Sequence, residues 1–419
     1  MHEQSKIVVL GSGFGGLETA FYLRKRLGRH VDLTVVSNSE QFLFKPNTIY
    51  VPFGKPVDEL KFDLAPVFDR RHIRFVNAAA DAVDPAAKTV TTSRGPVAFD
   101  KLVIATGAAM RPSEIPGLAE NANTIWSPPE MERLGVSLRA LVDRVSAGAK
   151  ARVLFLVPPH NMCAGPLYEL VLMLDTWLRR QGVRRSIEMR YATYERSFIQ
   201  AFGPRLHEMV TGEFKWRGIV GTNLAVVKAV EPGRIYFADG SSDSFDLLVS
   251  FPPYIAGQRY DALPSDDRGF LRTNVKTRQV DGHPDIYAVG DTGDFPVKQA
   301  FLALLQADAV AEHIAERVLG EDPIAAFDPV SMCIMEQFDK ATFAQVPLRL
   351  TGDPALPVVV REDAMDLYRV GSGSIWRVGK KMLGVAIPER FAAGRPFHAG
   401  ATWAVMEAGL KVMTAAFTD

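Results

Sequence analysis

Short apolar runs alternate with segments of helical periodicity along much of the chain. Residues 6–10, 31–37 and 151–157 are rich in Val, Leu and Ile. Uninterrupted apolar runs of this length are typical of strands that are buried on both faces of a parallel sheet. Amphipathic segments suited to helices follow the first and third runs, at 14–27 and 168–182. This order of strand, turn and helix predicts an α/β fold with parallel sheets.

The size and composition are those of a globular enzyme with two or three compact units. The chain has 419 residues, 47% of them hydrophobic and 23% charged, with 48 basic and 48 acidic residues. This neutral balance gives no indication of nucleic-acid binding. The N-terminus resembles no secretory signal, and no window offers about 18 unbroken apolar residues. We therefore expect a cytoplasmic protein without a metal site, which contacts a membrane only at its surface.

Three glycines after the first apolar run form the pattern G-x-G-x-x-G: Gly11, Gly13 and Gly16. Gly11 permits a tight turn, Gly13 lets the backbone approach a pyrophosphate, and Gly16 lets the next helix pack on the strand. The pyrophosphate would lie at the helix N-terminus, where free N–H groups and the helix dipole favour an anion. Because the motif lies between a strand and a helix, it predicts a dinucleotide-binding site.

The second predicted strand ends without the acidic residue that usually binds the ribose hydroxyls of a dinucleotide. Ser37 and Asn38 stand there instead. A serine hydroxyl can still hydrogen-bond a ribose hydroxyl, with less assistance from charge. We expect Ser37 and Asn38 to line the cofactor site; the alternative is that Ser37 only ends the strand.

Two later strands end in polar residues that fit the same pocket. One strand runs into Thr106 and Gly107, and the other runs into Gly290 and Asp291. Ligands of α/β sheets bind at the carboxyl ends of the strands, so a carboxylate at this edge suits a ligand hydroxyl. The three motifs in this order are more specific for a dinucleotide site than each one alone.

A second strand and helix, at 151–157 and 168–182, lack the glycine loop that would cradle a second dinucleotide. Residues 158–166 read PPHNMCAGP in its place. Prolines lack N–H donors and stiffen the backbone, and the side chains would crowd a pyrophosphate. We conclude that NAD(P)H does not bind here in the usual way.

A cysteine stands in this altered loop. Cys163 precedes a helix, whose free N–H groups would stabilise a thiolate. The other cysteine, Cys333, follows in the C-terminal region, within the sequence VSMCIMEQF. Two residues this far apart in sequence can be neighbours in the fold. The alternative is two unrelated buried thiols that behave as small apolar residues.

At this point the chain resembles the two-dinucleotide-domain flavoproteins related to glutathione reductase, through GSGFGG, ATG and AVGD. The resemblance implies two Rossmann-like domains, with FAD in the first and Asp291 on its ribityl chain. It also implies that Lys298 brings a positive charge to the flavin, although a solvated lysine at a helix start would look alike. Pro46 is assigned to the same cofactor site. The implied division is 1–112 with 270–325 for FAD, 113–269 for the second domain, and 326–419 for a C-terminal region.

The resemblance narrows to the sulfide:quinone oxidoreductases. CAGPLYE and VSMCIMEQF carry it, and LLVSFPPYIAG and EQFLFKPNTIYVPFG fit the same group. The resemblance implies FAD-dependent oxidation of sulfide through Cys163 and Cys333, with Cys333 beside the flavin and the electrons passed to a membrane quinone. Glu169 would manage a proton; its alternative role is that of an acid in the first turn of a helix, stabilised by the dipole.

Two departures from this family bear on the sulfur chemistry. The segment TIWSPPEMERL lacks a third cysteine that many members have, and Gln200 stands where a histidine is often seen. Three other functions therefore stay open. They are a flavocytochrome c-type sulfide dehydrogenase, a type II NADH dehydrogenase, and a flavoprotein that uses its two thiols as a redox switch without being an enzyme.

The C-terminal region predicts contact with a membrane. Met406, Leu410, Met413 and Phe417 recur at helical spacing and form one apolar stripe. Together with aromatic and basic neighbours around Trp376, such a stripe suits an interfacial anchor; the alternative is a helix packed on its own domain. A quinone would enter through this region, on the inner face of the cell membrane. The chain is also a possible homo-oligomer.

The resemblance suggests two aromatic residues that would stack on this quinone. They are Phe343 and Phe391, which lie in the C-terminal region. Aromatic rings stack favourably on a flat ring system, so both are candidates for the quinone site.

Overall fold

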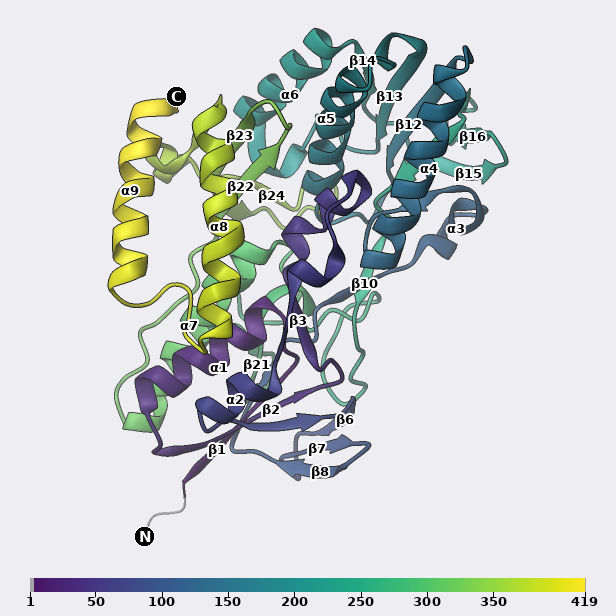
Figure 1. The fold of residues 1–419 in the computed structure, drawn as a ribbon. Helices are drawn as coiled ribbons and strands as arrows, with labels where there is room; N and C mark the ends of the chain where they lie inside the picture. Colours follow the sequence, from purple (N-terminus) through teal and green to yellow (C-terminus); the bar gives the residue numbers. More distant parts are fainter. Residues whose placement is uncertain (1–3, 419) are drawn as a thin grey trace.

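The computed structural model describes residues 4–418, and Figure 1 shows their arrangement. The first unit is built on a six-stranded sheet in the order β20-β21-β9-β1-β2-β5. Its strands are β1 (Ser5–Leu10), β2 (Val31–Ser37), β5 (Arg74–Asn77), β9 (Lys101–Ile104), β20 (Gln279–Val280) and β21 (His283–Ala288). All neighbours but β20 and β21 pair in parallel. The predicted buried strands at the N-terminus are confirmed.

Helices α1 (Phe14–Leu27) and α7 (Ala300–Leu319) pack against one another beside this sheet. The glycine loop joins β1 directly to α1, as the motif predicted. A small antiparallel sheet of β6 (Ala80–Asp84), β7 (Thr89–Thr92) and β8 (Gly95–Ala98) lies at the lower end in Figure 1.

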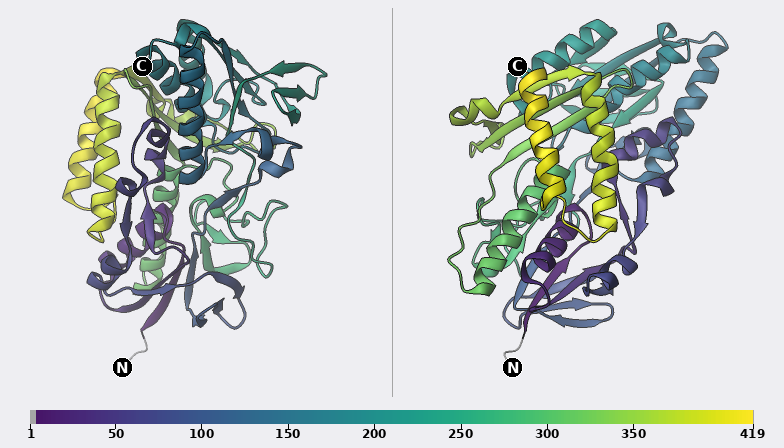
Figure 2. Two further views of the ribbon diagram at one scale, coloured as in Figure 1. Left: turned by 45° about the vertical axis from the view of Figure 1, so that its right-hand side comes forward. Right: turned by 60° about the vertical axis from the view of Figure 1, so that its left-hand side comes forward.

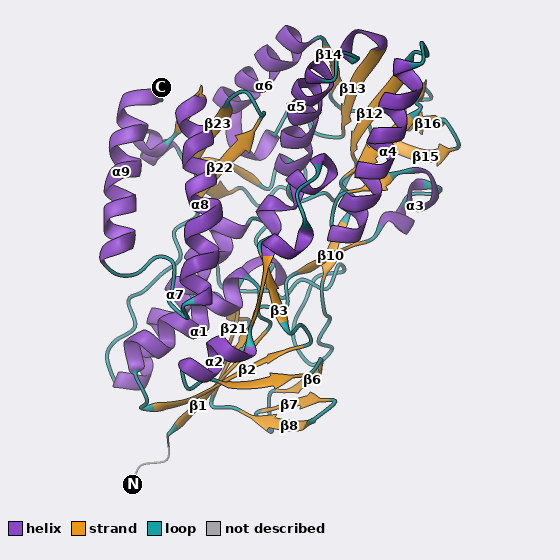
Figure 3. Cartoon of the chain, in the orientation of Figure 1, coloured by secondary structure: helices purple, strands orange, loops and turns teal. Residues whose placement is uncertain are grey.

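The second unit has a five-stranded parallel sheet in the order β11-β18-β12-β13-β14. Its strands are β11 (Asn123–Thr124), β12 (Ala151–Val157), β13 (Ile187–Thr193), β14 (Ile219–Thr222) and β18 (Leu247–Ser250). Helices α4 (Pro128–Ser146), α5 (Gly165–Arg180) and α6 (Gly203–Arg217) pack on one face of this sheet, as Figure 3 shows. The other face packs against β15 (Val227–Glu231) and β16 (Arg234–Phe237). Strands β10 (Ala108–Met110) and β19 (Tyr254–Ala256) pair where the chain crosses between the units.

The C-terminal region adds an antiparallel sheet and two helices. The sheet is formed by β22 (Val330–Glu336), β23 (Ala341–Leu350), β24 (Val358–Val360) and β25 (Arg369–Gly373). Helices α8 (Ser374–Ala392) and α9 (Ala401–Phe417) lie side by side along one side of the molecule in both views of Figure 2.

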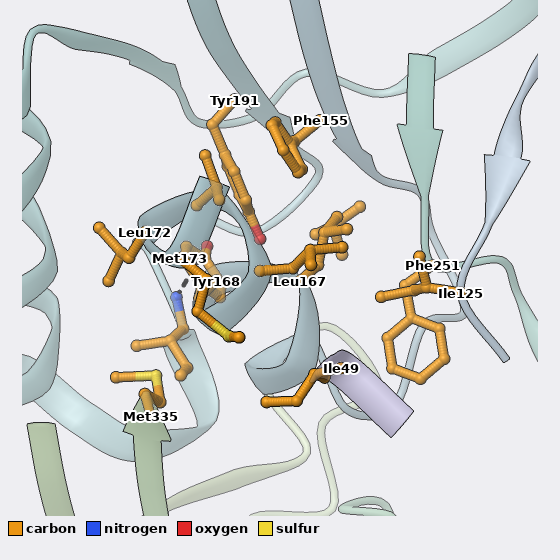
Figure 4. Packing of buried hydrophobic residues seen from close by; sticks show 14 of the residues in the cluster. Ile49, Ile125, Phe155, Leu167, Tyr168, Leu172, Met173, Tyr191, Phe251 and Met335 are labelled. Carbon is orange, nitrogen blue, oxygen red and sulfur yellow. Dashed lines mark hydrogen bonds between the residues drawn. The ribbon is translucent and has the colours of Figure 1, made fainter. Parts of the chain in front are cut away.

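The hydrophobic core of the second unit continues into the C-terminal sheet. In Figure 4, Tyr168 of α5 lies beside Tyr191 of β13, and Met335 of β22 reaches the same cluster from below. The rings of Tyr168 and Tyr191 stack with their centroids 4.4 Å apart. This shared core fixes β22 against α5, and it therefore fixes the two cysteine-bearing segments relative to one another.

The apolar stripe predicted as a membrane anchor mostly faces the protein. Met406, Leu410 and Met413 pack on the core, and only Phe417 is largely exposed, at 56%. Trp376, expected among the interfacial residues, is fully buried. Three of the four residues of the stripe are partly buried against the core, so the stripe is mainly a packing face. Within residues 4–418, no helix has both the length and the apolar content needed to cross a membrane.

Candidate active site

One large cavity of about 630 Å³ opens where both sheets and the C-terminal region meet. It is lined by the loop after β1, the ends of β2 and β9, the loop before α5, strand β22 and one side of α8. Almost every residue predicted to bind the cofactor lines it, namely Gly11, Gly13, Ser37, Asn38, Pro46, Thr106, Gly107 and Asp291. Cys163, Cys333, Glu169 and Lys298 line the same cavity.

The glycines of the loop after β1 have two different roles: Gly16 is required for packing, and Gly13 leaves room for a ligand. A side chain at Gly16 would overlap the carbonyl oxygen of Gly11, so this position keeps α1 close to β1. A side chain at Gly13 would meet nothing within 4 Å and would project into open space. The backbone at Gly13 is therefore free to approach a pyrophosphate at the start of α1, which fits the predicted role.

The predicted ribose contacts lie at the end of β2. The Ser37 hydroxyl is 2.8 Å from the Ser12 hydroxyl, and Ser37 also accepts a hydrogen bond of 3.2 Å from the Ser39 backbone N–H. Either hydroxyl of the pair can donate, so a donor remains available toward the cavity. Asn38 lines the cavity beside them.

Gly290 and Asp291 begin the turn that follows β21, and one residue separates them from the end of the strand. The Gly290 N–H donates to the Gln306 side chain at 2.8 Å, which holds this turn against α7. The Asp291 carboxylate lines the cavity and accepts no hydrogen bond from residues 4–418. Burial raises its pKa, and the positive charges of Lys298 and Lys45 partly offset this. A buried carboxylate without a donor fits the ribityl hydroxyls of FAD, which would supply one.

Lys298 is 3% exposed, so it is not the solvated lysine of the alternative reading. Its ammonium donates to the Gly293 carbonyl and lies 3.8 Å from the ring centroid of Phe270. Burial lowers the pKa of Lys298 to about 8. Lys298 lies two residues before α7, which begins at Ala300.

The altered loop of the second unit is tied to the neighbouring strand by Asn161. Its side chain donates to the Phe251 carbonyl at 2.9 Å and accepts from the Cys163 backbone N–H at 3.0 Å. These bonds keep the Cys163 thiol at the cavity. His160 has a left-handed backbone conformation, with φ of 62°. It does not line the cavity, and its Nε2 lies 3.7 Å from the Glu114 Oε1.

The two thiols are brought to the same cavity and are not joined in this structure. A side chain at Gly165, two residues after Cys163, would lie 4.0 Å from the Cys333 sulfur. Burial raises the pKa of Cys163 well above its ordinary value and the pKa of Cys333 to about 12. The Gly165 N–H lowers the pKa of Cys163, but burial outweighs the thiolate stabilisation that the sequence predicted.

Glu169 lies on the second turn of α5, which begins at Gly165, so it is not the first-turn acid of the alternative. It is linked instead to the C-terminal region. Its carboxylate accepts a hydrogen bond of 2.6 Å from the Glu336 backbone N–H and forms an ion pair with Lys380. Lys380 also donates to the Ile334 carbonyl at 2.9 Å. Burial raises the pKa of Glu169, and Lys380 partly offsets this.

Sequence reasoning missed Lys380 because it interpreted the basic residues of α8 as facing a membrane. Arg377 belongs to the same network and binds Glu336 at 2.8 Å, while Tyr50 donates to the other oxygen of Glu336 at 2.9 Å. The one signal available in the sequence was their spacing, since Arg377 and Lys380 lie three residues apart and share a helix face.

The two predicted quinone residues do not line the cavity. Phe343 is fully buried and stacks on Trp376 with centroids 4.2 Å apart. Phe391 is fully buried and packs on Phe42 at 5.4 Å and on Phe21 at 6.0 Å. Both rings belong to the core beneath α8.

A family model, pyridine nucleotide-disulphide oxidoreductase, matches residues 5–136. Sulfide-quinone reductase of Aquifex aeolicus is 29% identical over 255 residues, which cover 59% of this chain and 57% of that protein. The mitochondrial sulfide:quinone oxidoreductase of Dictyostelium discoideum is 22% identical over 84% of this chain and 80% of its own length. Type II NADH:quinone oxidoreductase of Staphylococcus epidermidis is 22% identical over 76% of this chain and 84% of its own.

Among solved structures, the sulfide:quinone oxidoreductase of Aquifex aeolicus superposes with a TM-score of 0.82. The alignment covers 99% of this chain and 97% of that chain at 23% identity. The α/β fold is thereby confirmed.

Proposed function

We propose that this protein, an FAD-dependent oxidoreductase that resembles the sulfide:quinone oxidoreductases, oxidises sulfide and passes the electrons to a quinone. One observation carries the proposal: Cys163 and Cys333, from segments far apart in the chain, line the same cavity as Gly13 and Asp291. Two thiols beside a dinucleotide site are the arrangement that two-electron thiol chemistry requires.

The residues of the cavity fit FAD, which supplies the acceptor for an electron pair when it is bound. Gly13 gives the pyrophosphate access to the start of α1, and the unpartnered Asp291 carboxylate suits a ribityl hydroxyl. Lys298, held against Gly293, keeps a cation at the wall of the cavity and favours negative charge that develops there.

The sulfur step uses the two cysteines as a pair. Hydrosulfide attacks one sulfur of a Cys163–Cys333 disulfide, the S–S bond breaks, and a persulfide forms on Cys163 while a thiolate leaves at Cys333. The oxidation of one sulfide to zero-valent sulfur releases two electrons, which reduce one quinone with the uptake of two protons. The nearness of Gly165 to the Cys333 sulfur supports this pairing.

Glu169 and Lys380 are placed to move a proton beside Cys333. The charges of both groups act on the Cys333 thiol, Glu169 raising its pKa and Lys380 lowering it. The carboxylate of Glu169 receives the proton that hydrosulfide brings and becomes neutral, and the ammonium of Lys380 then balances the negative charge of the released Cys333 thiolate. A buried acid with a raised pKa is suited to this exchange.

The loop before α5 argues against NADH as the electron donor, although type II NADH:quinone oxidoreductases are among the relatives. The loop contains Pro158 and Pro159, and Asn161 ties it to Phe251. Its backbone lacks the free glycine N–H groups that bind a pyrophosphate in a dinucleotide fold.

The quinone and the membrane meet the protein along α8 and α9. Leu383, Gly384 and Ile387 of α8 line the cavity, whereas Met382 and Val385 on the same helix are 60% and 56% exposed. Val405 and Val412 add an exposed apolar face on α9. These exposed faces support peripheral binding to a membrane, with the quinone entering beside Leu383. We place this contact at the inner face of the cell membrane.

An anaerobic sulfide titration of the FAD-loaded protein tests the proposal. Wild-type flavin absorbance is expected to bleach with about one equivalent of sulfide, whereas Cys163→Ser and Cys333→Ser retain FAD and do not bleach. NADH serves as the control reductant. Bleaching by NADH but not by sulfide would make the protein a type II NADH dehydrogenase instead.

A further inference from the structure

An ammonium without a polar partner lines the cavity at the start of the 3-10 helix Lys45–Phe53. The Lys45 nitrogen lies 3.1 Å from the ring centroid of Trp126. Within residues 4–418 it forms no hydrogen bond and no ion pair. Lys298 and Lys380, the other two lysines of the cavity, both have partners, in Gly293 and Glu169.

The charges of Asp291 and Glu130 act on Lys45 and partly offset the effect of burial on its pKa, but neither carboxylate forms an ion pair with its ammonium within residues 4–418. Glu130 accepts hydrogen bonds from the Ser127 backbone N–H at 2.6 Å and from the Thr124 hydroxyl. Asp291 lines the part of the cavity that fits the ribityl chain. Lys45 therefore keeps three N–H donors that only a ring face approaches, and an ammonium in this state favours an added anion.

The aromatic wall joins Lys45 to the cysteine loop. Trp126 lies 5.6 Å from Tyr254 and 6.0 Å from Phe251, measured between ring centroids. The Tyr254 N–H donates to the His160 carbonyl at 2.9 Å, and the Phe251 carbonyl accepts from Asn161, which positions Cys163. Lys45 and the Cys163 thiol thus belong to the same side of the cavity.

We propose that Lys45 and the face of Trp126 form an anion subsite that holds hydrosulfide before it reacts and the anionic sulfur chain that grows on Cys163. This inference rests on the proposed function. The ammonium attracts the anion, and the aromatic wall of Trp126, Phe251 and Tyr254 suits the large, weakly hydrated sulfur atoms. Burial lowers the pKa of Lys45 to about 8, so the charged form predominates at neutral pH.

Alkylation of Cys163 tests the subsite without sulfide or quinone. The FAD-loaded protein is reduced with a phosphine and treated with anionic iodoacetate or neutral iodoacetamide, and labelled peptides are quantified by mass spectrometry. The iodoacetate-to-iodoacetamide rate ratio at Cys163 is expected to exceed that of glutathione. It is expected to fall about fivefold in Lys45→Met, because the charge attraction is lost, and to persist in Lys45→Arg.

Lys55→Met is the matched control, because Lys55 lies beyond the same helix and is ion-paired with Glu59. It should leave the ratio unchanged. Equal ratios in wild type and Lys45→Met would overturn the proposal, as would loss of FAD in Lys45→Met, which would assign Lys45 to the cofactor. If Lys45→Met does not fold, the same rate ratio is measured in Lys45→Gln. The wild-type ratio is also compared with that of glutathione, and equal values would contradict the subsite.

Steady-state kinetics distinguish failure of the subsite from failure of the proposed function. With sulfide and quinone, Lys45→Met is expected to raise KM for sulfide about fivefold, with kcat and the KM for quinone unchanged. An unchanged sulfide KM would overturn the subsite. A wild type that does not oxidise sulfide would overturn the proposed function, while the alkylation ratio would still show whether Lys45 binds anions.

Discussion

Lys380 of α8 forms an ion pair with Glu169 of α5, 211 residues away in the sequence. The two side chains are 10% and 8% exposed. This contact ties α8 to α5, the helix that follows Cys163. The same residues thus fix the position of the C-terminal region and set the charge beside Cys333.

Replacing Lys380 with Met is expected to lower the free energy of unfolding by about 3 kcal/mol, because Glu169 is left as a buried, unpaired charge. Urea unfolding of the FAD-loaded protein measures this. Lys381→Met, at an exposed neighbouring position, is the control and should change little. The double variant Lys380→Met with Glu169→Gln should recover part of the loss; no recovery would contradict a charge-based cause.

Gly13 and Gly16 are expected to respond differently to alanine. Gly16→Ala places a methyl group against the Gly11 carbonyl and should disrupt folding of the first unit. Gly13→Ala meets open space, so the protein should fold with normal circular dichroism yet bind FAD more weakly, because the methyl group crowds the pyrophosphate. FAD titration of the apoprotein measures this, and unchanged affinity would contradict the cofactor position.

Asp285 is expected to make stability depend on pH. Burial alone would raise its pKa, but hydrogen bonds from Lys101 and Lys88 lower it to about 2. A lowered folded-state pKa stabilises the protein above about pH 4, and this contribution disappears as the pH falls toward 2. Asp285→Asn should cost at most about 2 kcal/mol at pH 7. The difference from wild type should narrow below pH 4 in urea unfolding curves; a constant difference would exclude the ionised carboxylate as its cause.

The exposed apolar face of α8 is expected to hold the protein at a membrane. Wild type should sediment with anionic phospholipid vesicles, and the variant Met382→Asp with Val385→Asp should stay in the supernatant, because burying either carboxylate in lipid is unfavourable. Val136→Asp, at an exposed apolar position of α4, is the control. Equal sedimentation of all three proteins would argue against α8 as the contact.

Local sequence patterns predicted strands β2 and β12 and the glycine turn after β1 correctly. Strands β2 and β12 have the predicted bounds, and the glycines at 11–16 join β1 to α1. These features depend on near neighbours, because β-branched runs and glycines act on the backbone conformation of a few residues. The absence of a second glycine loop at 158–166 could be predicted as well, because it too depends only on the local sequence.

Only the tertiary structure decided which polar groups face one another and which apolar faces are covered. The sequence marked Cys163 and Cys333 but not Lys45 or Lys380, because an isolated lysine looks the same on a surface as in a cavity. The stripe on α9 matched a membrane face as well as a packing face, and the ring of Phe391 matched a quinone site as well as a core position. Periodicity determines that a helix has an apolar side, whereas what covers that side depends on contacts between segments far apart in the chain.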